Sequence, residues 1–267
     1  MGIDGKALDE EIVGRSKKNI DFFTRFKKGH PQQMVMLHYD GLARDPLDAQ
    51  GLFADGHWLY FNGAKMMSDV PAQPGETDIA VTDVRLFKTT IGRYGDGKED
   101  VGLCELDTNG KPDWSKAEQV RLISVTPGER NAGTIRVQRA QFGTKARAFA
   151  KGHAYAAAHA TLGPFGKNSN LLWFYNFAIT CPRDAKGQTC SEVLAAEFGR
   201  LFTTDLASFD GLEFDVMRHS YAERRDTRGR TIDADADGKA DGGFVNGNDV
   251  YGAGTMSFCA LLRKTLG

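Results

Sequence analysis

Short runs of apolar and β-branched residues, separated by turns rich in Gly, Asp and Asn, fill the sequence between residues 77 and 153. The clearest runs cover residues 79–84, 100–106, 119–125 and 134–139, and residues 107–110 (Asp-Thr-Asn-Gly) have the composition of a hairpin turn. Runs of this length with turn residues between them are typical of β-strands. The pattern therefore predicts an all-β module, which we place at residues 76–160.

The segments on either side of this module have a different pattern of apolar residues. Residues 34–39 and 170–178 are mainly apolar, which predicts buried strands, and residues 209–217 predict a further strand. Apolar stripes predict helices over residues 6–28, 190–202 and 254–266. Strands that alternate with helices favour a parallel sheet with right-handed crossovers.

This order predicts an α/β fold, namely a partial (β/α)8-type barrel with an inserted all-β module. Residues 1–75 would hold an N-terminal helix and the first strand or strands of the barrel, and residues 161–267 its continuation with a calcium loop. A complete barrel of this type takes about 250 residues without an insertion. The chain offers too few strand–helix units for that, so we interpret it as a fragment of a longer protein, with a small open sheet as the alternative.

Two carboxylates share one face of the strand predicted at residues 209–217. Because side chains alternate along a strand, Glu213 and Asp215 point to the same side, while Leu212 and Phe214 point to the other. Two carboxylates in one confined space are expected to differ in pKa, which provides an acid and a base near neutral pH. The alternative is a structural role, in which the acids cap the next element or pair with a nearby cation.

A loop with acidic residues at alternate positions comes after this strand. The spacing D-x-D-x-D-G-x-x-D predicts a calcium site with side-chain ligands from Asp233, Asp235, Asp237 and Asp241 and a backbone carbonyl from Lys239. The loop differs from an EF-hand because its twelfth position lacks the bidentate Glu. All the ligands come from one turn, so the ion would be structural. The alternative is a solvated acidic loop without an ion.

The strand at residues 209–216, together with the aromatic run at 173–177 and the calcium loop, resembles segments of glycoside hydrolases with a TIM-barrel fold. The resemblance implies a carbohydrate-active hydrolase in which Glu213 is the general acid and Asp215 the base or nucleophile, acting on a polysaccharide or oligosaccharide. The later barrel strands of that family are absent from this sequence. The residues expected to bind substrate at the same rim are Asp40, Trp173, Tyr175, Asn176, Arg218 and His219. The alternative for the aromatic residues is a place in the core, and that for Arg218 and His219 is a salt bridge to loop acids.

A second hypothesis is a non-catalytic glycan-binding or scaffold protein of the cell surface or extracellular space. The formal net charge of −1 and the even spread of Lys and Arg give no indication of a nucleic-acid partner. No apolar run is long enough to span a membrane, and no signal peptide is visible at the start of the chain.

Cys181 and Cys190 could form a disulfide or remain two buried thiols. The calcium loop favours an extracytoplasmic location, whether secreted, periplasmic or at the cell surface.

Overall fold

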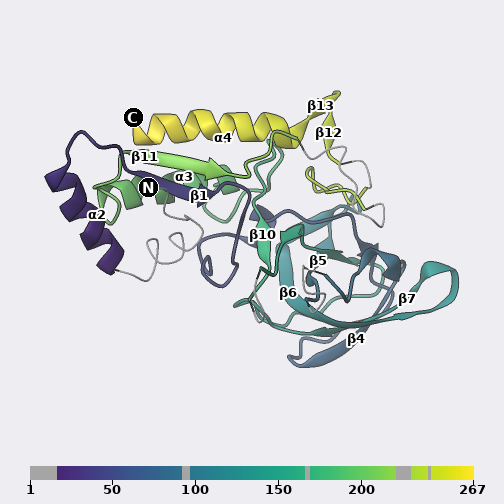
Figure 1. Cartoon of the computed structure of the whole chain (residues 1–267). Coiled ribbons are helices and arrows are strands. Elements are labelled where there is room, and N and C mark those ends of the chain that lie inside the picture. Colours follow the sequence, from purple (N-terminus) through teal and green to yellow (C-terminus); the bar gives the residue numbers. More distant parts are fainter. Residues whose placement is uncertain (1–16, 92–96, 166–168, 221–229, 240–241) are drawn as a thin grey trace.

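A curled antiparallel sheet of six strands dominates the computed structural model, which describes residues 17–91, 97–165, 169–220, 230–239 and 242–267 (Figure 1). The edge strands of the sheet meet, because Met66 and Val81 form a bridge and the Met67 N–H donates to the Ala80 carbonyl at 2.6 Å. The sheet therefore curls into a barrel. In spatial order its strands are β3 (Ala64–Lys65), β8 (Ala154–Ala158), β5 (Asp100–Leu106), β6 (Pro112–Pro127), β7 (Gly133–Gln138) and β4 (Glu76–Val81).

Apolar side chains at alternate strand positions fill the inside of this barrel. On β5, for example, Val101 and Leu103 are buried in the barrel core, whereas Cys104 belongs to a second core outside it. Side chains alternate between the two faces of a strand, and both faces of β5 are covered, so its successive apolar side chains enter two different cores. Other strands contribute to the barrel core in the same way through Ile79, Val81, Val120, Leu122, Ile135 and Val137.

The second part of the molecule is built on two parallel strands, β1 (Met36–Asp40) and β11 (Gly211–Asp215). Helices α3 (Cys190–Thr203) and α4 (Val250–Leu266) cover one face of this pair, since Phe198 of α3 and Phe258 of α4 both contact Phe214. In the register of the pair, His38 lies opposite Glu213 and Asp40 opposite Asp215. The face that bears these residues points away from α3 and α4.

Smaller elements connect the two parts. Strand β10 (Leu172–Phe174) pairs antiparallel with β2 (Ala43–Arg44) and β9 (Thr161–Leu162), and β12 (Phe244–Val245) forms a hairpin with β13 (Asn248–Asp249). Helix α2 (Lys17–Gly29) lies near the start of β11, where Lys27 pairs with Asp210 at 2.6 Å. The described residues also form short 3-10 helices, namely η1 (Asp55–His57), η2 (Val84–Leu86) and η3 (Glu129–Asn131).

A single apolar core joins the barrel to the parallel pair. It contains Tyr39 of β1, Phe198 of α3 and Phe258 of α4, and it continues into Trp114 and Tyr155 on the outer surface of the barrel. Tyr60 stacks on Trp114 with ring centroids 3.6 Å apart. The two parts are therefore packed against each other through buried side chains.

The predicted fold class, a partial (β/α)8-type barrel, is wrong, and so is the resemblance to TIM-barrel glycoside hydrolases. Among the described residues the strands are mostly antiparallel, β1 with β11 is the one parallel ladder, and the helices are α2, α3 and α4. The apolar run at 170–178 caused part of the error. It forms only the three-residue β10 in an antiparallel sheet, where the sequence suggested a central parallel strand.

Individual elements agree better with the sequence. The strand predicted at 34–39, the runs at 100–106 and 134–139 and the helices at 190–202 and 254–266 are confirmed within a few residues as β1, β5, β7, α3 and α4. Residues 6–16 of the first predicted helix lie outside the described residues. In the part of the chain that the structure describes, no helix combines the length and the hydropathy needed to span a membrane.

Candidate functional site

Glu213 and Asp215 lie on the same face of β11, as their spacing predicted, and His38 of β1 lies between them. The Nδ1 atom of His38 is 3.5 Å from Glu213 Oε2, and its Nε2 atom is 3.9 Å from Asp215 Oδ2. The Glu213 side chain is 67% exposed and that of Asp215 is 33% exposed. Water therefore reaches both carboxylates, and the imidazole is positioned to contact either of them.

Asp40 ends β1 next to this cluster and supports the backbone of the next residues. Its Oδ1 atom accepts hydrogen bonds from the N–H groups of Leu42 at 2.9 Å and Ala43 at 3.1 Å, and the residue is buried. Arg218 and His219 come after β11 and are exposed. The structure thus places Asp40 beside the carboxylates at the carboxyl end of the parallel pair, where ligands bind in open α/β sheets.

The aromatic and amide residues predicted to contact substrate lie in the core. Trp173 and Tyr175 are at most 1% exposed, and the Tyr175 hydroxyl lies 2.9 Å from the hydroxyl of Tyr39. The Asn176 side chain donates to the Gly56 carbonyl and accepts from the Ala178 N–H. These contacts hold the segment after β10 in place.

The acidic loop brings Asp233, Asp235 and Asp237 together. One oxygen from each carboxylate can be chosen so that all three lie within 4.8 Å of one another, which is a spacing that a metal ion can bridge. Asp233 also accepts backbone hydrogen bonds from Asp237 at 3.0 Å and Gly238 at 2.9 Å, and these bonds shape the turn. This group could hold a metal ion.

The donor set of the loop fits a hard cation. Each carboxylate oxygen keeps a lone pair after it has accepted one backbone hydrogen bond. Burial, together with the neighbouring Asp235 carboxylate, raises the pKa of Asp233 to about 8, because no cation among the described residues lies close enough to offset these two effects. The Lys239 ammonium pairs with Asp237, and its hydrogen bonds keep the pKa of Asp237 low against the opposing effect of burial. Asp241, the fourth predicted ligand, lies outside the described residues.

Residues on both sides of the loop fasten it to the barrel and to the helical part. Arg230 forms a buried ion pair with Glu99 at 2.7 Å, and the Asp233 N–H donates to the Tyr60 carbonyl at 2.9 Å. Thr180, in the segment after β10, donates to the Ala234 carbonyl at 3.2 Å. The loop therefore lies at the junction of the two parts, where an ion would fix the conformation of a turn whose backbone contacts both of them.

Sequence reasoning missed His38 as a member of the carboxylate cluster. Its position before Tyr39 and Asp40 in an apolar run was the available signal, but only the register of β1 with β11 places it opposite Glu213.

Cys181 and Cys190 are buried free thiols, and the Cys190 N–H donates to Cys181 Sγ at 3.5 Å. The second of the two alternatives for this pair is therefore the one observed.

Comparisons with known proteins give no assignment for this arrangement. No protein-family model matches the chain, no curated protein shows significant similarity to it, and no solved structure matches it. The function of the chain is therefore inferred from its own geometry and chemistry.

Proposed function

We propose that the protein is a calcium-braced, non-catalytic binding protein that acts outside the cytoplasm. The observation that carries this proposal is the cluster of Asp233, Asp235 and Asp237, whose carboxylate oxygens converge at the junction of the barrel and the helical part. Calcium takes six to eight oxygen ligands in flexible geometry, so a loop with several carboxylates suits it better than magnesium, which requires near-ideal octahedral geometry. Calcium is abundant outside the cytoplasm, which accounts for the proposed location.

The ion in this proposal stabilises the fold. An ion that binds the folded chain and not the unfolded chain adds stability as its concentration exceeds the dissociation constant, by about 2.7 kcal/mol at a hundredfold excess. For a chain of this size the corresponding rise in melting temperature is about 5 °C. The brace would hold Ala234 against Thr180 and the loop against Tyr60.

Thermal unfolding with calcium, with magnesium and with a chelator tests the proposal. We expect calcium to raise the melting temperature of the wild type and of the control variant Asp205→Asn, which alters an exposed acid outside the loop. The variant Asp235→Asn should respond much less. If calcium shifts Asp235→Asn as much as the wild type, or shifts neither protein, the loop is not a calcium site.

A second candidate function is hydrolysis of glycosidic bonds at Glu213 and Asp215. The observation in its favour is that His38 lies between two carboxylates of one sheet face, at the carboxyl ends of parallel strands. In this mechanism Glu213 would protonate the leaving oxygen and Asp215 would act as base or nucleophile. The exposure of Glu213 favours the non-catalytic function, because glycosidases raise the pKa of their acid by shielding it from water.

Assays of the variants Glu213→Gln and Asp215→Asn on a panel of polysaccharides distinguish the two candidates. Catalysis predicts reducing-end release by the wild type and a loss of about a hundredfold or more in each variant. The matched control is Glu129→Gln, which alters a glutamate on the barrel remote from β11. Absence of product from every polysaccharide would leave the binding protein as the better account.

A further inference from the structure

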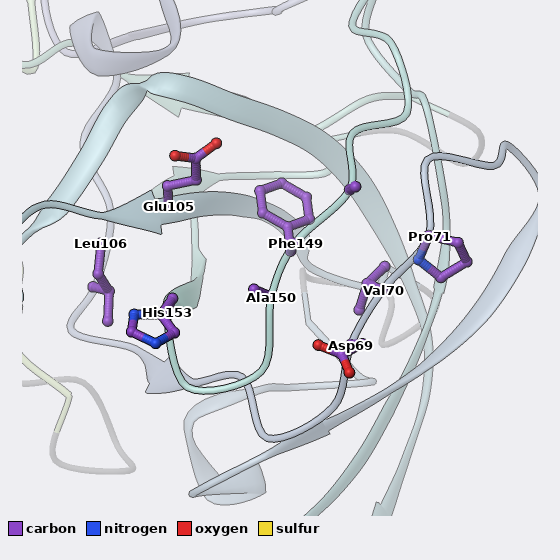
Figure 2. A pocket seen from close by; sticks show the side chains of 9 residues that line it. Asp69, Val70, Pro71, Glu105, Leu106, Phe149, Ala150 and His153 are labelled. Carbon is purple, nitrogen blue, oxygen red and sulfur yellow. The ribbon is translucent and has the colours of Figure 1, made fainter.

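A cavity of about 610 Å³ opens at the end of the barrel where β5 stops and β8 begins (Figure 2). This volume lies within the range of small-molecule binding sites. Figure 2 shows that one side of the cavity carries Glu105, Leu106 and His153, and the other side carries Asp69, Val70 and Pro71. The cavity is separate from both the acidic loop and the carboxylates of β11.

The floor of the cavity belongs to the barrel core. Val70 and Phe149 form a bridge in which each N–H donates to the carbonyl of the other residue, at 2.9 and 2.8 Å. Both side chains are 2% exposed and pack in the core. The floor is therefore apolar and does not depend on a ligand for its position.

A buried ion pair fixes the backbone that forms the wall of the cavity near Pro71 and Ala148. Arg139 and Glu118 are fully buried, and Arg139 Nη2 lies 2.6 Å from Glu118 Oε2. Arg139 also donates to the carbonyls of Pro71 at 3.1 Å and Arg147 at 2.7 Å, while Glu118 accepts from the Arg147 N–H at 2.9 Å. Because these bonds fix the backbone at residues 71 and 147, the wall is formed before any ligand binds.

Both carboxylates of the lining already have partners: Glu105 pairs with two cations, and Asp69 accepts a hydrogen bond from a neutral backbone N–H. Glu105 lies 3.4 Å from both Lys116 Nζ and Arg147 Nη2, and Asp69 Oδ1 accepts from the Lys151 N–H at 2.8 Å. A cationic ligand would have to compete with these bonds for Glu105. A neutral ligand would keep them and still find acceptors on the carboxylates, together with the exposed imidazole of His153.

We propose that this cavity binds a neutral sugar. Sugar hydroxyls both donate and accept hydrogen bonds, so they match carboxylates and an imidazole, and the apolar face of a sugar ring matches the accessible side chains of Pro71 and Leu106. The inference supplies the ligand class of the proposed binding protein and in that sense rests on it. The two are tested separately, since calcium binding is read from thermal unfolding and sugar binding from direct titration.

Saturation-transfer NMR with glucose, galactose, mannose, xylose, N-acetylglucosamine and cellobiose tests the site, with choline as a cationic comparison. We expect at least one sugar to bind with an affinity in the millimolar range, as is usual for an open site with few polar contacts. The variant Ala150→Trp fills the cavity from an exposed position in its lining, and Ala185→Trp adds the same side chain to a distant loop. Ala150→Trp should weaken sugar binding at least about tenfold, and Ala185→Trp should leave it unchanged.

Each alternative result overturns the proposal. Sugar binding that survives Ala150→Trp would place the sugar elsewhere on the protein. Choline binding in the absence of sugar binding would show that the cavity selects a cation. Absence of binding by every probe to the folded wild-type protein would show that the cavity takes no ligand of this class.

Discussion

Asp100 is a buried carboxyl whose ionisation the fold opposes. Burial raises its pKa to about 7, against the opposing effect of a 2.8 Å hydrogen bond from Trp173 Nε1. In the unfolded chain it ionises near pH 4, so between about pH 4 and 7 the folded state binds the extra proton and stability falls as pH rises. We predict that Asp100→Asn gains stability relative to the wild type from about pH 4 to pH 8, by up to about 4 kcal/mol.

Denaturant unfolding of both proteins at about pH 4, 6 and 8 measures this difference. Asn keeps an oxygen that can accept the Trp173 hydrogen bond, so the change removes the charge and, with it, a long ion pair to Arg121 at 3.9 Å. A difference in unfolding free energy that is the same at all three pH values would mean that Asp100 ionises normally in the folded protein.

The Arg139–Glu118 pair provides a second prediction for single residues. Both side chains are 0% exposed, so Arg139→Met would leave the Glu118 carboxylate buried without its partner. We expect a loss of about 3–5 kcal/mol in unfolding free energy. Arg136→Met, which breaks a surface pair with Glu76 on the neighbouring strand, should have a much smaller effect in the same chemical denaturation experiment. Equal effects of the two substitutions would contradict the burial of Arg139.

Helix α4 depends on a glycine for its docking. A Cβ atom at Gly254 would overlap the carbonyl oxygen of Phe177, so the helix can lie against this segment only without a side chain there. Ala is the better helix former by about 1 kcal/mol, yet we predict that Gly254→Ala destabilises the protein by about 3 kcal/mol. The exposed Ser257→Ala is the control. Thermal melting that shows Gly254→Ala to be as stable as the wild type would contradict the close approach.

At the level of elements, the sequence predicted what is determined locally. Helix α3 was predicted from its apolar stripe, which lies within its own residues, and in the structure a capping box of Thr189 and Glu192 begins the helix. The metal loop could be predicted in the same way, because its Asp residues and its glycine come from one short segment. The shared face of Glu213 and Asp215 results from strand alternation alone.

Pairing between segments that are distant along the chain could not be predicted from the sequence. The bridge that joins the edge strands of the barrel and the register of β1 with β11 link segments that no local pattern connects. The lack of information on these pairings also explains the errors in the predicted environments of the site residues. Whether Trp173 faces a ligand or the core, and whether water reaches Glu213, depends on which elements cover them.

Across the whole molecule, one core extends from the helices to the outer surface of the barrel. Trp114 of β6 stacks on Tyr60 in this core, and Gly102 of β5 leaves the space that the two rings occupy. The barrel has a second core of its own inside. The shared core therefore decides whether the helical part unfolds together with the barrel or separately from it.

We predict that Trp114→Ala lowers the unfolding free energy by about 3–5 kcal/mol and that the chain still unfolds in one transition. The helices of the described chain lie outside the barrel, so the helix signal in far-UV circular dichroism reports on the helical part. Fluorescence of Trp58 and Trp173 reports on the core beside the barrel. Coincident midpoints by both signals, shifted equally by the substitution, are expected. A helix signal that melts at its wild-type midpoint would mean that the two parts fold independently, because truncating a side chain they share would then have left the helices unaffected.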